Sequence, residues 1–156
     1  MGAKQGSVSL LNDPVAQDLL QSSIPARLAY NWKDGTPRVV PIWFFWNGDE
    51  FVFGSPEKAP KLKALKSGAK LALTIDDNTF PHKVLLVRGT ARVEMTNDAV
   101  IPEYAAAARR YFGEEQGTAW CGQVSQMGQK MARISMKPEC VGVLDFQSRL
   151  PSAIPS

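Results

Sequence analysis

The chain has 156 residues, of which 44% are hydrophobic and 21% charged, and its formal net charge at pH 7 is +3. This length and composition predict one globular domain with its own core. The weak positive charge argues against a nucleic-acid binder, which gathers far more Lys and Arg on one face. No apolar run reaches the roughly 20 residues that span a bilayer, and the N-terminus MGAKQGSVSLLNDP has no apolar signal segment, so we expect a cytoplasmic protein.

Cysteine and histidine are scarce. Cys121 and Cys140 are expected to be reduced thiols in a chain without an export signal. With His82 they lie in three separate regions, so no metal site is predicted. A single histidine, between Pro81 and Lys83, argues against a Ser-His-Asp or Cys-His hydrolase, and we interpret it as a loop residue.

The first half of the chain alternates turn residues with strand patterns. Residues 1–12 are expected to be flexible, and Asn12 or Asp13 followed by a proline predicts a helix over about 14–22. ARLAYNW and RVVPIWFFW flank an Asp-Gly hairpin turn, and EFVFGS follows as a third antiparallel strand. The apolar run Val39–Trp46 predicts a strand covered on both faces, although Pro41 within it requires one free or bulged edge.

The second half continues this pattern. A lysine-rich helix over about 57–67, with a glycine as its C-cap, precedes the strands KLALTIDD and KVLLVRGTARVEM, the second bent at Gly89. A helix over about 98–112 follows, and 114–130 is open between a short helix and a loop. KMARISMKP and CVGVLDF predict two last strands, and 147–156 a surface tail. The order predicts an α+β domain, mainly antiparallel β, with helices flanking a sheet or barrel.

One corner of this domain is expected to gather phosphate-binding groups. If the strands before and after NGDE form one hairpin, Arg38 lies beside Gly54, Ser55 and the lysine-rich helix. The guanidinium, the hydroxyl, Lys58, Lys61 and the helix amides are the donors that a phosphate needs. A solvated surface helix is the alternative interpretation of the lysines.

A flat apolar slot is expected next to the phosphate corner. Val40, Pro41, Ile42 and Trp43 run along the neighbouring strand, where a free backbone edge and apolar side chains suit a planar ring. A phosphate beside such a slot is typical of a flavin-like cofactor. Trp120, in the ambiguous 114–130 segment, either packs in the core or a dimer interface or covers the ring.

From DGTPRVVPIWFFWNGDEFVFGSPEKAPKLKALKSGAKLALTIDD through VRGTARVEM to ARISMKPECVGVLDF, the chain resembles the pyridoxamine 5′-phosphate oxidase-like, FMN-binding split-barrel superfamily, and within it the small flavin/deazaflavin oxidoreductase branch. The resemblance covers about residues 13–146. It implies a six-stranded split β-barrel that forms a homodimer with cofactor sites between the subunits. The cofactor-binding residues that it implies, together with the corner and slot above, are Arg38, Val39, Val40, Pro41, Ile42, Trp43, Gly54, Ser55, Lys58 and Lys61.

One departure from the superfamily pattern bears on the choice of cofactor. Its common Ser-Arg-Lys phosphate triplet is Ala59-Pro60-Lys61 here, so the serine and the arginine are missing. Lys58 can compensate for the charge. The departure weakens the expectation of FMN more than that of a phosphate. The deazaflavin F420 is the alternative cofactor, and haem is less expected than either.

The sequence therefore predicts an FMN- or F420-dependent oxidoreductase that transfers a hydride to or from a small organic substrate. No side chain stands out as a catalytic acid or base, which suits chemistry carried by the cofactor. The alternative is a non-catalytic flavin- or haem-binding carrier of the same fold. A pyridoxamine-phosphate oxidase proper is less expected, since the chain closes on QSRLPSAIPS. The substrate, the electron donor and the choice between FMN and F420 are left open.

Overall fold

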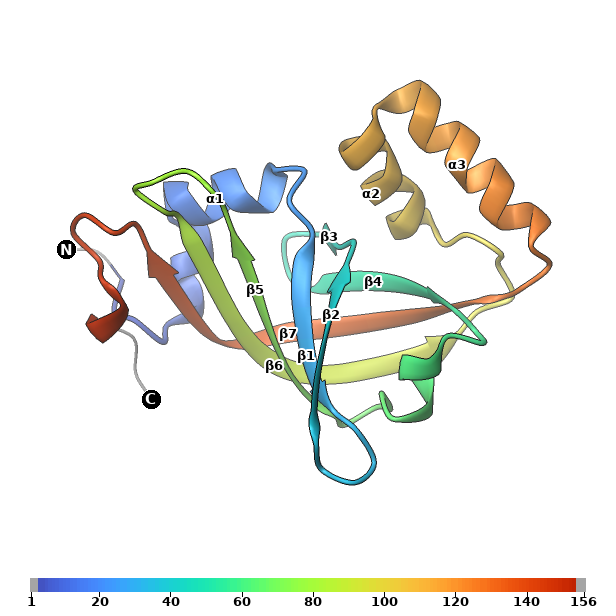
Figure 1. Cartoon of the computed structure of the whole chain (residues 1–156), viewed down its shortest axis with the longest axis horizontal. Coiled ribbons are helices and arrows are strands. Elements are labelled where there is room, and N and C mark those ends of the chain that lie inside the picture. Colours follow the sequence, from blue (N-terminus) through green and yellow to red (C-terminus); the bar gives the residue numbers. More distant parts are fainter. Residues whose placement is uncertain (1–2, 154–156) are drawn as a thin grey trace.

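A computed structural model describes residues 3–153; the outermost residues of the predicted flexible N-terminus and of the C-terminal tail lie outside the described part. Seven antiparallel strands form one sheet in the order β2-β1-β5-β6-β7-β4-β3. The strands are β1 (Ala26–Asn31), β2 (Pro37–Ile42), β3 (Phe45–Trp46), β4 (Phe51–Pro56), β5 (Lys70–Asp76), β6 (Val84–Met95) and β7 (Met131–Leu144). The sheet curls into an open half-barrel (Figure 1).

Helices cover two separate parts of this half-barrel. They are α1 (Pro14–Gln21), α2 (Pro102–Phe112) and α3 (Glu114–Gln126), with 3-10 turns η1 (Val8–Asn12), η2 (Pro60–Lys63) and η3 (Pro151–Ala153). Figure 1 shows α1 near one end of β5 and β6, whereas α2 and α3 lie together on the side of β3 and β4. None of the helices in residues 3–153 has the length and apolar character needed to cross a bilayer.

The core fills the inside of the curl. On β5, Leu71, Leu73 and Ile75 alternate with outward residues, and all three are buried in the main cluster. Leu19 and Leu20 of α1 close the same core. The predicted class, an α+β antiparallel half-barrel with flanking helices, is confirmed. The sheet has seven strands, one more than the superfamily resemblance implies. The predicted strand after the Asp-Gly turn is interrupted and yields both β2 and β3, whereas the two predicted last strands form the single strand β7.

This interruption corrects the expected three-stranded meander. β2 pairs only with β1, and the hairpin with β4 is made by β3 alone, with Phe45 opposite Val52. β2 is an edge strand, as Pro41 requires. Most of its residues are exposed, so the prediction that this run is covered on both faces is wrong. Val39, whose side chain is 66% exposed, marks the uncovered face.

The lysine-rich segment is less helical than predicted. Only η2 forms, a single 3-10 turn with Pro60 at its start and no side-chain cap. Like charges crowd this segment, whereas buried Leu62 and Leu65 hold it against the core. Packing therefore positions the segment, and the expected helix over 57–67 is wrong.

Three later elements also differ from their predicted bounds. α2 begins at Pro102 and not at residue 98, because a proline is favoured in the first turn of a helix. The ambiguous segment forms α3, and the two last strands are one strand, β7. The bend predicted at Gly89 is confirmed as a register shift between Arg88 and Gly89 on β6.

Both ends of the described chain pack on the half-barrel. Gly6 exchanges backbone hydrogen bonds with Val141 of β7, and Leu10 and Leu11 of η1 are buried. Arg149 Nη1 lies 2.7 Å from Asp13 Oδ2, which ties the C-terminal segment to the start of α1. The flexibility expected of residues 1–12 stays a prediction.

Candidate functional site

A cavity of about 290 Å³ opens where the end of β2, the β2–β3 crossing, β4 and α2 meet. We call it the proline–tryptophan pocket, and it is lined by Pro25, Pro41, Ile42, Trp43, Gly54, Pro56 and Tyr104. Four of the ten predicted cofactor-binding residues, Pro41, Ile42, Trp43 and Gly54, are thus brought together. Three of the predicted slot residues thus line one cavity, although β2 is not part of the hairpin that was expected to build the slot. Their contact with a cofactor stays a prediction.

The β2–β3 crossing places Trp43. Arg110 of α2 donates a hydrogen bond of 2.6 Å to the carbonyl oxygen of Phe44, and its guanidinium lies 4.6 Å from the centre of the Phe44 ring. The Trp43 ring packs at 5.2 Å from the Tyr111 ring and at 5.4 Å from the Tyr104 ring. Such packing holds Trp43 against α2 and leaves part of it to line the pocket.

The missing side chain of Gly54 makes room for Tyr104. A Cβ built at Gly54 would lie 2.9 Å from Tyr104 Cδ2 and 2.6 Å from Met131 Sδ. The neighbouring ion pair between Glu103 and Arg133, 2.8 Å long, fastens the start of α2 to β7. Gly54 is therefore a position of close approach, and the α2 tyrosine takes the space above it.

The lysine-rich segment borders a second cavity, of about 510 Å³. We call it the lysine cavity; it is lined by Glu57, Lys58, Ala59, Leu62, Lys63, Leu65, Lys66, Ser67, Val93 and Met95. Its lining begins at Glu57, directly after Pro56 of the proline–tryptophan pocket, so the two cavities flank the end of β4. The two linings are therefore joined through consecutive residues of the chain, Pro56 and Glu57.

Lys61 is the half-buried lysine of this segment, and it lies outside the linings of both cavities. Burial lowers the pKa of its ammonium group below the ordinary value. Within residues 3–153 it has no ion-pair partner. A partly buried ammonium group without a counter-charge is energetically costly, and a bound anion would stabilise it.

Ser55 faces the other side of β4. Its hydroxyl is buried, with 1% of the residue exposed, and has no hydrogen-bond partner in the described structure. It lies on the strand face that Phe51 and Phe53 present to the main core, opposite the face of Gly54. Its predicted contact with a cofactor stays a prediction.

The remaining predicted residues lie outside both cavity linings. Arg38 bonds locally to Thr36 Oγ1, at 2.6 Å, and to the carbonyl oxygen of Pro37, close to the β1–β2 turn. The pairing expected to bring Arg38 beside Gly54 does not form, because β2 and β4 are at opposite ends of the strand order. Val39 and Val40 precede the pocket-lining part of β2.

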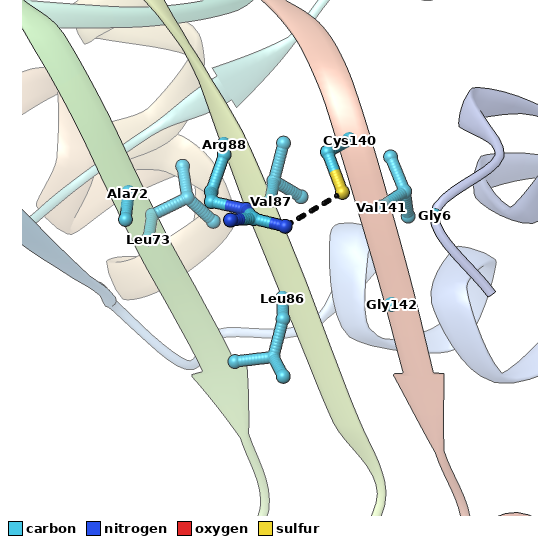
Figure 2. Close-up of a pocket in the computed structure, with 9 residues that line it drawn as sticks. All are labelled: Gly6, Ala72, Leu73, Leu86, Val87, Arg88, Cys140, Val141 and Gly142. Carbon is cyan, nitrogen blue, oxygen red and sulfur yellow. Dashed lines mark hydrogen bonds between the residues drawn. The ribbon is translucent and has the colours of Figure 1, made fainter. Parts of the chain in front are cut away.

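A third cavity, of about 180 Å³, lies on the outer face of β5, β6 and β7 (Figure 2). Figure 2 shows Arg88 reaching across to Cys140, with its Nη2 donating to the thiol at 3.1 Å. Ala72 and Leu86 supply apolar lining. None of the predicted site residues belongs to this cavity.

Sequence reasoning missed three pocket residues, Pro25, Pro56 and Tyr104. Pro56 ends the strand that carries the predicted Gly54 and Ser55. Pro25 directly precedes Ala26, which pairs with Ile42, so the predicted β1–β2 hairpin already carried the information that would have placed it. Tyr104 lies in an alanine-rich helix, and no local pattern separates it from a packing residue. His82, expected in a loop, lies between β5 and β6 with its ring 5.6 Å from that of Phe146, outside the pocket.

The curled antiparallel half-barrel with flanking helices is the fold of a split-barrel protein. The family model described as pyridoxamine 5′-phosphate oxidase matches residues 13–144, and the chain belongs to this family. Comparison with curated protein sequences gives no significant match.

Solved structures with this fold include proteins of different functions. An F420 reductase is 24% identical, with a TM-score of 0.62 over 81% of this chain and 94% of its own. A conserved hypothetical protein from Mycobacterium tuberculosis is 18% identical, with a TM-score of 0.72 over 99% of this chain and 95% of its own. HutZ, the haem storage protein from Vibrio cholerae, is 16% identical, with a TM-score of 0.64 over 84% of this chain and 93% of its own. At these identities the likeness shows the fold.

Proposed function

We propose that this protein is a cytoplasmic, flavin-dependent oxidoreductase that binds FMN or F420 and acts on a small organic substrate. One observation carries the proposal: the proline–tryptophan pocket and the lysine cavity flank the same end of β4. A cofactor with a planar ring and a phosphate needs these two environments side by side.

The residues present fit such a cofactor. Pro41, Ile42 and Trp43 would contact the ring. Lys58, which lines the lysine cavity, would hold the phosphate together with Lys61 of the following turn, which lies outside the cavity lining. The half-buried ammonium group of Lys61 gains a counter-charge in this arrangement. When bound, the cofactor supplies the hydride chemistry, and the chain binds it, orients it and excludes water from its ring.

We also propose that the protein acts as a homodimer. At about 290 Å³, the proline–tryptophan pocket is small for a cofactor ring, since ligand sites commonly enclose about 300–1,000 Å³. A second copy of the chain would complete it. Light scattering of the purified protein, with and without cofactor, tests this proposal: a dimer with one cofactor per chain supports it, and a cofactor-bound monomer contradicts it.

A carrier that binds its cofactor without turnover is the second candidate. The pocket lining supplies contacts and hydrogen-bond donors, and a carrier needs nothing more. Haem fits this lining less well than a flavin. Tyr104 is the lining residue of a type that ligates haem iron, and its oxygen already accepts a hydrogen bond from Trp120.

The deciding experiment is spectroscopic. We would record absorption and fluorescence of the purified protein, and titrate it with FMN, F420 and haemin. Tight binding of FMN or F420, followed by reoxidation of the reduced cofactor when substrates are added, supports the oxidoreductase. Binding without turnover favours the carrier, and binding of none of the three contradicts both.

A further inference from the structure

The hydroxyl of Tyr104 is a hydrogen-bond donor without an acceptor in the described structure. Trp120 Nε1 lies 3.0 Å from Tyr104 Oη. An indole N–H can only donate, so the tyrosine oxygen accepts this bond and its own O–H remains to donate. Within residues 3–153, no acceptor takes a hydrogen bond from it. A donor that is half-buried and unused is costly unless a ligand or water accepts from it.

The pocket offers few other side-chain donors. Pro25, Pro41 and Pro56 have neither a polar side chain nor a backbone N–H, and the side chain of Ile42 is apolar. Tyr104 and Trp43 are therefore the lining residues whose side chains donate hydrogen bonds. A ring in this pocket meets mainly apolar surfaces, with Tyr104 as the donor that α2 contributes.

Packing fixes the position of Tyr104, and burial keeps its hydroxyl protonated. Its ring rests on Gly54, where any larger side chain would collide with it. Burial raises its pKa above the ordinary value, so the phenol is protonated at neutral pH and acts as a donor. The bond from Trp120 polarises the O–H and strengthens its donation.

We propose that Tyr104 donates a hydrogen bond to an acceptor atom, a carbonyl oxygen or a ring nitrogen, on the cofactor ring in the proline–tryptophan pocket, and that Trp120 orients its hydroxyl for this contact. The inference rests on the proposed function. It makes Tyr104 a cofactor-binding residue and Trp120 a positioning residue.

The test compares Tyr104→Phe with Tyr30→Phe, which removes a hydroxyl from the main core, away from the pocket. Each folded variant and the wild type are titrated with FMN and with F420. We expect Tyr104→Phe to raise the Kd of the bound cofactor about 3- to 10-fold, as loss of one hydrogen bond does. We also expect it to shift the visible absorption band of the bound cofactor, which a change in helix packing alone would not do. Tyr30→Phe is expected to change neither.

Each outcome is decisive. If the wild type binds FMN or F420 and Tyr104→Phe matches it in Kd and band position, the inference fails while the proposed function stands. If Tyr30→Phe weakens binding as much as Tyr104→Phe does, the inference also fails. If the wild type binds neither cofactor, the proposed function fails first. Should Tyr104→Phe not fold, Trp120→Phe decides: about 2- to 3-fold weaker binding with a band shift supports the inference, and no change overturns it.

Discussion

The guanidinium of Arg110 donates a hydrogen bond of 2.6 Å to the carbonyl oxygen of Phe44, across 66 positions of the chain. Its Nε donates another of 3.0 Å to the carbonyl oxygen of Ser22. One α2 side chain therefore fastens the β2–β3 crossing and the segment before β1. Because Trp43 lies next to Phe44, this contact also positions the pocket wall.

Replacing Arg110 should unfold the protein more easily. Arg110→Ala leaves two partly buried carbonyl groups without their donor, so we expect the free energy of unfolding to fall by about 2–4 kcal/mol. Urea denaturation measures the change. The neighbouring Arg109→Ala is the control, because Arg109 makes an exposed contact of 3.7 Å with Glu114, and we expect it to change stability by less than about 0.5 kcal/mol. Equal losses in both variants would contradict the anchoring role of Arg110.

Gly54→Ala tests the close approach of α2 to β4. The new Cβ would collide with Met131 and Tyr104, and we expect overpacking to cost about 1–3 kcal/mol of stability and to weaken cofactor binding. Gly122→Ala is the matched control, since a Cβ at this position in α3 meets nothing within 4 Å. Alanine favours the helix there by about 0.5–1 kcal/mol. Thermal unfolding of both variants should show opposite signs, and a neutral Gly54→Ala would mean that the approach is not tight.

Ser55→Ala separates a structural role of this hydroxyl from a ligand-binding one. Removing a buried hydroxyl without a partner should leave the cofactor-free protein as stable as the wild type, or more stable by up to about 1 kcal/mol. If the hydroxyl contacts the cofactor, as the superfamily resemblance implies, the same variant should bind FMN or F420 more weakly. Urea denaturation and cofactor titration of one preparation give both values. A marked loss of stability without cofactor would show that the hydroxyl has a partner in the folded chain.

Lys61→Ala should weaken cofactor binding by about 1–3 kcal/mol, through loss of a charge-assisted hydrogen bond to the phosphate, with little effect on folding. Lys70→Ala removes the same charge from an exposed position at the start of β5, outside both cavity linings. We expect it to weaken binding by less than about 0.5 kcal/mol. Fluorescence titration compares the two variants. Similar losses would indicate a diffuse electrostatic field in place of a phosphate contact. The superfamily resemblance makes the same prediction for Arg38→Ala as for Lys61→Ala.

Acid should weaken the link between the chain ends. The hydrogen bond from Arg149 holds the pKa of Asp13 below its ordinary value of 3.8. The unfolded state then binds more protons, so this stabilisation is complete above the unfolded pKa and is lost as the pH falls through the lower folded value. Unfolding by urea between pH 5 and about pH 3 should show this loss.

Two substitutions at Asp13 separate its two roles, because its Oδ1 also caps α1 through Val15 N at 2.9 Å. Asp13→Ser keeps a capping oxygen and loses the ion pair, so it should reduce the loss of stability in acid at little cost to the helix. Asp13→Ala should cost about 1 kcal/mol more, through loss of the cap. If Asp13→Ser is as acid-sensitive as the wild type, the effect arises elsewhere.

Much of the local structure could be predicted from residue patterns. Asp34-Gly35 set the β1–β2 hairpin, Gly89 marked the bend of β6, and Pro14 marked the start of α1. Each is a conformational preference that acts over a few residues, so the local sequence suffices.

The errors arose where packing overrode such preferences. The lysine-rich segment has a pattern typical of a helix, but only Pro60–Lys63 forms a 3-10 turn. Pro41 and the apolar residues after it suited one continuous strand, yet Arg110, far along the chain, holds the crossing at Phe44 between two strands. Arg110 is 66 positions from Phe44, so no short stretch of sequence around residue 44 includes it.

The sequence by itself determined the class of fold, the place of Pro41 at a sheet edge, and the basic character of the segment after β4. These depend on hydrophobic periodicity, turn residues and charge, which are local. Only the tertiary structure decided that β2 and β4 lie at opposite ends of the strand order, that Ser55 faces the core, and that Tyr104 shares the pocket with Gly54. These relationships join residues that are distant in the chain, and the packing of the whole core sets them.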